Sequence, residues 1–129
     1  MNKKIKPTEA ELEVLAVLWQ QGPSTVRTVF EAVHEPRGIG YTTTLKILQI
    51  MHEKGMVKRD ESARTHIYEA AVKEQDTQKA MLNDFVNSAF SGSASKLVLQ
   101  ALGNHKTSAE ELEKIKALIK KIEAGGDNE

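Results

Sequence analysis

Apolar side chains recur at helical spacing in three stretches near the start of the chain. A capping-box sequence, Thr8 to Glu11, precedes the first stretch, and Gly22-Pro23 ends it. A turn rich in helix breakers, residues 35–40, separates the second stretch from the third, and Gly55 ends the third. The pattern therefore predicts three short helices, over about residues 9–20, 25–34 and 41–54.

The pattern changes after the third predicted helix. Residues 56–60 and 65–70 flank a polar turn at 61–64, and this arrangement predicts a β-hairpin. Three short helices followed by a hairpin is the order of elements in a winged helix, which is a helix-turn-helix with a β wing. The expected fold class is mainly α with a small β wing, and the winged helix-turn-helix DNA-binding domain is expected to occupy residues 1–72.

From about Lys73 the pattern is helical again, in three segments. Three short amphipathic helices cannot cover their own apolar faces, so residues 73–124 must pack on the winged helix or against a second copy of the chain. We favour a second copy, because the first seventy residues already form a closed unit, and we expect a helical dimerisation region followed by a disordered tail at 125–129. The predicted dimerisation residues are Leu82, Phe85, Val86, Phe90, Leu97, Val98, Leu102, Leu112, Ile115, Leu118, Ile119 and Ile122.

The charge of the chain is balanced overall and uneven along its length. It has 18 basic and 18 acidic side chains, whereas nucleic-acid-binding domains are usually basic. Residues 36–73, however, hold seven basic against four acidic side chains, and the segments before and after them have net charges of −1 and −2. The positive excess therefore coincides with the third predicted helix and the hairpin, although a +3 segment is also compatible with an ordinary solvated surface.

Several classes of chemistry are excluded by what the sequence lacks. With no cysteine it has no disulfide, no Cys-ligated zinc and no cysteine nucleophile. His34-Glu35 and His52-Glu53 begin like a zinc-binding HExxH motif, but Gly38 and Met56 stand where its second histidine belongs. We therefore expect no enzyme, no metal and no cofactor. No apolar run is long enough for a signal core or a membrane span, so we expect a cytoplasmic protein with no direct membrane insertion.

The third predicted helix has a polar stripe opposite its apolar face. In a helix-turn-helix the second helix enters the major groove, with its N-terminal residues nearest the base edges. Threonine and lysine suit phosphates or bases there, and glutamine can pair with adenine. A solvated polar face is the alternative interpretation, since threonine also suits a helix start. The candidate DNA-contacting residues of this helix are Tyr41, Thr42, Thr43, Lys46 and Gln49.

The predicted hairpin adds basic side chains to this picture. Lys58, Arg59, Arg64 and His66 crowd one short wing, where they suit contact with phosphates or the minor groove. Together with the helix stripe they favour binding of DNA. The alternative function is a winged-helix protein-interaction adaptor that does not read DNA.

A series of short motifs runs in order from about residue 8 to residue 122. The motifs are Leu12-Glu13-Val14-Leu15, Leu18-Trp19, residues 22–27, Tyr41-Thr42-Thr43, residues 53–57, residues 64–68, residues 90–93 and Leu97-Val98. The order and spacing of these motifs resemble the penicillinase-repressor (BlaI/MecI/CopY) family of bacterial winged-helix transcriptional regulators.

The resemblance implies a homodimeric repressor that binds an inverted-repeat operator in double-stranded DNA, with one winged helix on each half-site. It implies that the third helix, with the five residues named above, reads the major groove. It also implies that Arg59, Arg64 and His66 of the wing contact the DNA backbone and that the C-terminal helices form the dimer interface.

Two features differ from the pattern of this family. Copper-responsive members end in paired Cys-x-Cys motifs, and this chain has no cysteine. For the antibiotic-responsive members, the resemblance implies inactivation when a membrane sensor protease triggers cleavage at an Asn-Phe bond in the dimerisation region. The aligned residues here are Gln100 and Ala101. They occupy the position of the possible cleavage region, but they are not the Asn-Phe pair. The resemblance thus adds a membrane sensor protease as a candidate partner.

Overall fold

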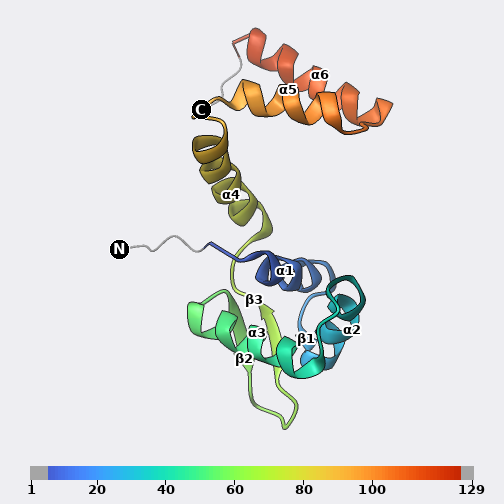
Figure 1. Cartoon of the computed structure of the whole chain (residues 1–129), viewed down its shortest axis with the longest axis vertical. Coiled ribbons are helices and arrows are strands. Elements are labelled where there is room, and N and C mark those ends of the chain that lie inside the picture. Colours follow the sequence, from blue (N-terminus) through green and yellow to red (C-terminus); the bar gives the residue numbers. More distant parts are fainter. Residues whose placement is uncertain (1–5, 126–129) are drawn as a thin grey trace. The chain divides into compact units, whose positions relative to one another are not determined.

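A computed structural model describes residues 6–125 of the chain (Figure 1). Internal contacts divide the chain between Asn83 and Asp84, within one helix, into an N-terminal unit and a C-terminal unit, and each is described by itself. The elements are α1 (Glu9–Gln21), β1 (Ser24–Thr25), α2 (Val26–Arg37), α3 (Tyr41–Lys54), β2 (Val57–Asp60), β3 (Ile67–Ala70), α4 (Glu74–Ala89), α5 (Ala94–Asn104) and α6 (Ala109–Glu123).

The first helix begins at the predicted capping box. The Thr8 hydroxyl accepts a hydrogen bond from the Glu11 amide at 3.1 Å, and the Glu11 carboxylate accepts one from the Thr8 amide at 3.0 Å. Two of the backbone donors that a helix start leaves unpaired are satisfied in this way. The helix ends where predicted, at Gly22, whose positive φ of 82° suits glycine.

The second helix is longer than predicted, so the expected turn over residues 35–40 was wrong for its first three residues. α2 continues through Pro36 to Arg37, and only Gly38, with a left-handed φ of 66°, ends it. Proline has no N–H for the hydrogen bond one turn back, but its φ has a helical value, and only Arg37 follows it in the helix. The glycine is the residue that provides the stop.

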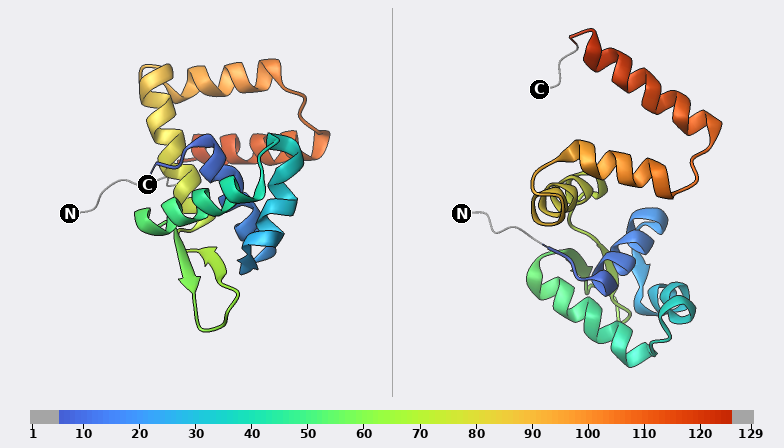
Figure 2. Two further views of the ribbon diagram at one scale, coloured as in Figure 1. Left: turned by 60° about the horizontal axis from the view of Figure 1, so that its bottom comes forward. Right: turned by 45° about the horizontal axis from the view of Figure 1, so that its top comes forward.

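The predicted hairpin is present and belongs to a three-stranded antiparallel sheet with the order β1-β3-β2. β2 pairs with β3 in the register Arg59 opposite Tyr68, and β3 pairs on its other side with β1, where Ser24 lies opposite Tyr68. The loop between β2 and β3 extends beyond the three helices of the N-terminal unit as a wing (Figure 2). β1 was not predicted, because a strand of two residues has no detectable alternation.

A single apolar cluster forms the core of the N-terminal unit. One polar residue, Thr44, is fully buried beside it, and its hydroxyl donates to the Gly40 carbonyl at 3.0 Å. The indole of Trp19 donates to the Val72 carbonyl at 2.9 Å and so joins α1 to the segment after β3. The buried cluster consists of Val14, Leu15, Leu18, Val26, Val29, Leu48, Met51, Met56, Val57 and Tyr68.

The C-terminal unit has well-capped helices but little buried surface. The hydroxyls of Ser93 and Ser108 accept hydrogen bonds from the backbone amides of α5 and α6. No residue of α5 or α6 is buried. Helix capping therefore specifies these helices locally, while their apolar faces lack a covering layer within the unit.

Candidate nucleic-acid interface

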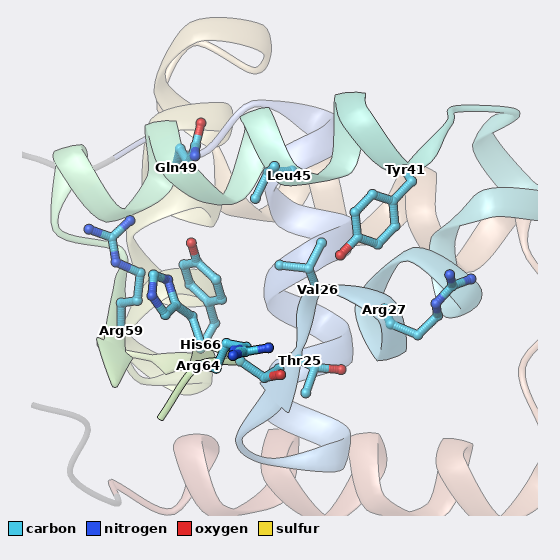
Figure 3. A pocket seen from close by; sticks show the side chains of 11 residues that line it. Thr25, Val26, Arg27, Tyr41, Leu45, Gln49, Arg59, Arg64 and His66 are labelled. Atoms are coloured by element: carbon cyan, nitrogen blue, oxygen red, sulfur yellow. The ribbon is translucent and has the colours of Figure 1, made fainter. Parts of the chain in front are cut away.

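The start of α2, the helix α3 and the wing surround a hollow of about 610 Å³ in the N-terminal unit (Figure 3). Three arginines and a histidine line it, so the hollow is locally cationic although the net charge of the chain is zero. The lining residues are Thr25, Val26, Arg27, Tyr41, Leu45, Gln49, Arg59, Arg64, Thr65, His66 and Tyr68.

The helix α3 presents its predicted polar stripe to solvent. Thr44, Leu48 and Met51 lie on the buried face, whereas Thr42, Thr43, Lys46 and Gln49 are all exposed. Of these exposed residues, Gln49 also lines the hollow beside the wing, and the other three do not. The run of three threonines is therefore divided: two face solvent, and Thr44 belongs to the core.

Tyr41 lies at the corner between α2 and α3, where its ring has neighbours from α2. It is 42% exposed, and its ring meets Phe30 edge-on with the ring centroids 5.7 Å apart. The guanidinium carbon of Arg27 lies 5.4 Å from the centre of the Tyr41 ring. Sequence reasoning did not name Arg27 as a DNA-contacting residue, although it ends the motif of residues 22–27 and lies two residues after the helix cap Thr25.

Arg59 of the wing is already engaged inside the protein. A hydrogen bond with the Tyr68 side chain, and a second one with the Glu61 carboxylate, raise the pKa of Arg59. In return the Arg59 guanidinium lowers the pKa of Glu61. Arg64 and His66, in the loop of the wing, are exposed and line the same hollow. Lys58 lies outside the hollow, opposite Glu69 in the strand register.

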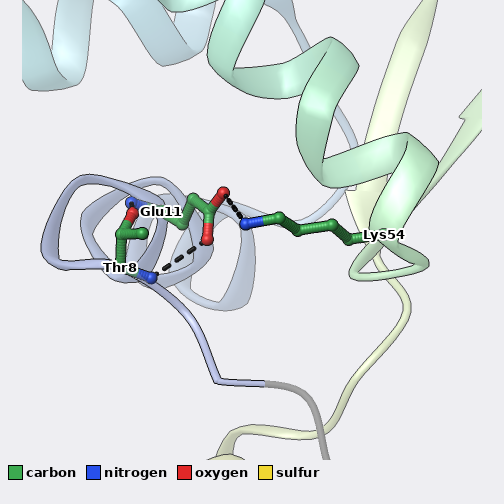
Figure 4. Close-up of polar contacts among 3 residues, drawn as sticks. All are labelled: Thr8, Glu11 and Lys54. Carbon is green, nitrogen blue, oxygen red and sulfur yellow. Dashed lines mark hydrogen bonds and ion pairs between the residues drawn. The ribbon is translucent and has the colours of Figure 1, made fainter. Parts of the chain in front are cut away.

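An ion pair fixes the far end of α3 to the start of α1 (Figure 4). The Lys54 ammonium lies 2.8 Å from the carboxylate of the nearly buried Glu11. Burial alone would raise the pKa of Glu11, but the hydrogen bonds from Lys54 and Thr8 and the charge of Lys54 outweigh it, and the pKa is lowered. The helix with the polar stripe is thus anchored at the end opposite Tyr41.

The predicted dimerisation residues divide into two sets by exposure. Val86, Phe90, Leu97, Leu112 and Ile115 are half-buried. Sequence reasoning missed Leu99, which at 71% is the most exposed of the large apolar side chains in the described residues. The predicted residues that are exposed are Leu82, Phe85, Val98, Leu102, Leu118, Ile119 and Ile122.

The region aligned with the family's cleavage site lies within regular structure. Gln100 and Ala101 are both exposed, and both belong to α5. The Gln100 side chain accepts a hydrogen bond from Asn104 at 3.1 Å, one helical turn further on. The bond between Gln100 and Ala101 is therefore a helical peptide bond in this structure.

Three helices, a three-stranded sheet with a projecting hairpin, and an outward-facing third helix define a winged helix. A profile of the Penicillinase repressor family matches residues 7–121. The chain belongs to this family, which confirms both the fold class and the family resemblance predicted from the sequence. Since the family consists of transcriptional repressors, the expectation that the chain is not an enzyme is also confirmed.

Individual relatives agree with the family match over nearly the whole chain. The methicillin resistance regulatory protein MecI of Mammaliicoccus sciuri is 22% identical over 93% of this chain and 98% of its own length. The transcriptional regulator BlaI of Mycobacterium tuberculosis (strain CDC 1551 / Oshkosh) is 29% identical over 99% of this chain and 93% of its own. The solution structure of the DNA-binding domain of the repressor BlaI matches 59% of this chain and 93% of that domain, with a TM-score of 0.51 and 24% identity.

Two features are absent from the described residues. Between residues 6 and 125, no helix is long and apolar enough to cross a lipid bilayer. Over the same range, no group of three or more His, Cys, Asp or Glu side chains is placed to hold a metal ion.

Proposed function

We propose that this chain represses transcription as a homodimer that binds an inverted-repeat operator in double-stranded DNA. The observation that carries the proposal is the juxtaposition of the exposed polar stripe of α3 with the cationic side chains around the neighbouring hollow. A helix that projects polar side chains beside a basic wing has the two parts that winged helices use, one for base edges and one for phosphates.

In this proposal α3 enters the major groove. Thr42, Lys46 and Gln49 lie at i, i+4 and i+7 and so form one continuous stripe that base edges can meet. Tyr41 and Thr43 complete the N-terminal end of the contact surface. The wing contributes backbone contacts from Arg59, Arg64 and His66, of which Arg64 and His66 are exposed.

In this proposal the C-terminal helices form the surface that binds the second copy of the chain. Their exposed leucine, isoleucine, valine and phenylalanine side chains would lie in water in a monomer, and burying them against an identical face is favourable by about 25 cal/mol for each Å² of apolar surface. A dimer also explains how a neutral chain can bind DNA tightly, because two weakly basic heads act on one duplex. An inverted repeat is the operator symmetry that a two-fold dimer requires.

The test is a fluorescence-anisotropy titration of the full-length chain with a duplex from the promoter of its own gene and with a random duplex of equal length. We expect preference for the promoter duplex, and affinity for both that falls steeply as salt rises, because phosphate contacts release counterions. Lys46→Ala with Gln49→Ala should remove the preference while leaving a folded dimer. Salt-independent or absent binding by the wild-type chain would favour the adaptor function instead.

Relief of repression by proteolysis at Gln100-Ala101 is a separate hypothesis, with less support from the residues. The family's Asn-Phe pair is replaced, and the bond is part of α5. Since proteases cut extended backbone, α5 would have to unwind first. Mass spectrometry of the chain from cells before and after antibiotic exposure tests the idea: fragments ending at Gln100 would support it, and an intact chain during induction would rule it out.

A further inference from the structure

Arg27 lies at the opposite end of the hollow from the wing. Figure 3 shows Arg27 beside Tyr41 at one end, with Arg59 and His66 at the other. Arg27 belongs to α2, so it reaches the hollow from a different element than the wing cations. The surface proposed to bind DNA therefore has cations at both ends of the hollow that runs along one face of α3.

Two aromatic rings hold the Arg27 side chain. Its guanidinium carbon is 5.4 Å from the centre of the Tyr41 ring and 5.8 Å from that of Phe30. Both distances are within the range of a cation–π interaction. The two rings also contact each other edge-on, with an angle of 69° between their planes, so they form one platform.

The Arg27 guanidinium nevertheless remains accessible. Its side chain is 65% exposed, and its nearest carboxylate oxygen, on the equally exposed Glu31, is 3.9 Å away. An exposed ion pair at this distance contributes little. Arg59 differs, since its side chain is only 23% exposed and it has hydrogen bonds with Glu61 and Tyr68.

We propose that Arg27 contacts a backbone phosphate of the bound DNA and that Tyr41 is its positioning residue. The inference rests on the proposed function. Phosphate contacts fix the register and orientation of a protein on the duplex, and the first helix of a helix-turn-helix crosses the DNA backbone, so a cation at the start of α2 suits such a contact. Arg27 supplies this contact at the end of the hollow away from the wing. Tyr41 acts through its ring, which holds the guanidinium in place, rather than by reading a base.

The first test replaces the charge. In the anisotropy titration, Arg27→Gln should weaken binding to the promoter duplex and to the random duplex by the same factor. It should also reduce the slope of log K against log salt by about 0.9 for each chain bound. Lys73→Gln is the matched control, because Lys73 is exposed in the same unit and does not line the hollow. An Arg27→Gln slope equal to that of the control would overturn the proposal.

The second test separates the Tyr41 ring from its hydroxyl. Tyr41→Leu should bind DNA about twofold to fivefold more weakly than the wild type, and Tyr41→Phe, which keeps the ring, should restore most of that loss. In the Arg27→Gln background, Tyr41→Leu should cause no further loss, since the residue it positions is gone. A Tyr41→Phe variant as weak as Tyr41→Leu, or full additivity of the two changes, would contradict the positioning role.

These outcomes are distinct from failure of the proposed function. If the wild-type chain binds with a steep salt dependence and Arg27→Gln leaves the slope unchanged, only this inference is overturned. If the wild-type chain shows no salt-dependent binding, both are overturned. Thermal unfolding followed by the fluorescence of Trp19, the single tryptophan of the chain, verifies that each variant is folded.

Discussion

The two units of this chain have similar helical patterns but bury their apolar side chains to very different degrees. In the N-terminal unit, Leu15 and Leu48 are fully buried in a core that three helices and a sheet share. In the C-terminal unit, Phe85 and Ile122 are more than half exposed, and neither α5 nor α6 buries a residue. The difference teaches that helical periodicity specifies an apolar face but not what covers it: the first unit is complete in one chain, and the second is not.

The largest expected effect tests the completeness of the N-terminal unit. Leu48→Ala removes a fully buried side chain from the middle of the core and should lower the free energy of unfolding by about 2–5 kcal/mol. Leu99→Ala, at the most exposed apolar position, should lower the stability of the N-terminal unit hardly at all. Urea unfolding followed by Trp19 fluorescence measures the stability of both variants. Similar losses of stability in the two variants would contradict the difference in burial between the two units.

The next prediction concerns the incompleteness of the C-terminal unit. Ile119→Asp places a charge on the exposed apolar face of α6 and should convert the dimer to a monomer, with at least a tenfold loss of operator affinity, about 1.4 kcal/mol. Ala117→Asp adds the same charge to an exposed position on the other side of the helix, and it should leave the dimer intact. Light scattering measures the oligomeric state. A monomeric wild-type chain, or equal effects of the two variants, would contradict a dimer interface on this face.

A smaller effect is expected from the ion pair that anchors α3. The pKa of Glu11 is lower in the folded chain than its ordinary value of 4.5, so ionised Glu11 stabilises the fold above that value. Glu11→Gln should therefore cost about 1–3 kcal/mol at neutral pH. The difference between variant and wild type should shrink as the pH falls below 4.5 and through the folded pKa. A difference that stays constant down to low pH would show that the carboxylate charge is not responsible.

The smallest effect is expected at the wing, where satisfied and accessible cations lie side by side. Glu61→Gln removes the carboxylate that engages Arg59 and should raise affinity for a random duplex about twofold to fivefold. Glu35→Gln removes the same charge from an exposed position of α2 that does not line the hollow, and so reports the effect of net charge alone. Equal gains in the two variants would mean that release of Arg59 contributes nothing.

The helices, the hairpin and the polar stripe of α3 were predictable because each rests on local signals. Capping residues, glycine stops and apolar spacing lie within a few residues of the elements they define, as Thr8 and Gly55 illustrate. The continuation of α2 through Pro36 was not predictable from breakers alone, since a proline can remain helical when a later glycine ends the helix.

What sequence reasoning missed at the candidate site depends on contacts between distant residues. The pair of Lys54 with Glu11 joins positions 43 residues apart, and the engagement of Arg59 by Tyr68 follows from strand register. Arg27 comes beside Tyr41 only when α2 and α3 pack at their corner. Composition and spacing list the cations correctly, but folding decides which of them are already paired and which remain accessible to a ligand.

The most direct measurement of the central claim is the salt dependence and stoichiometry of binding to the promoter duplex by the wild-type chain. Two heads, each with about three accessible cations, should lose about a thousandfold in affinity between about 50 and 200 mM salt. Two chains should bind each duplex, as sedimentation of the complex can measure. Affinity that does not change with salt, or one chain bound to each duplex, would contradict a dimeric repressor that reads DNA with α3.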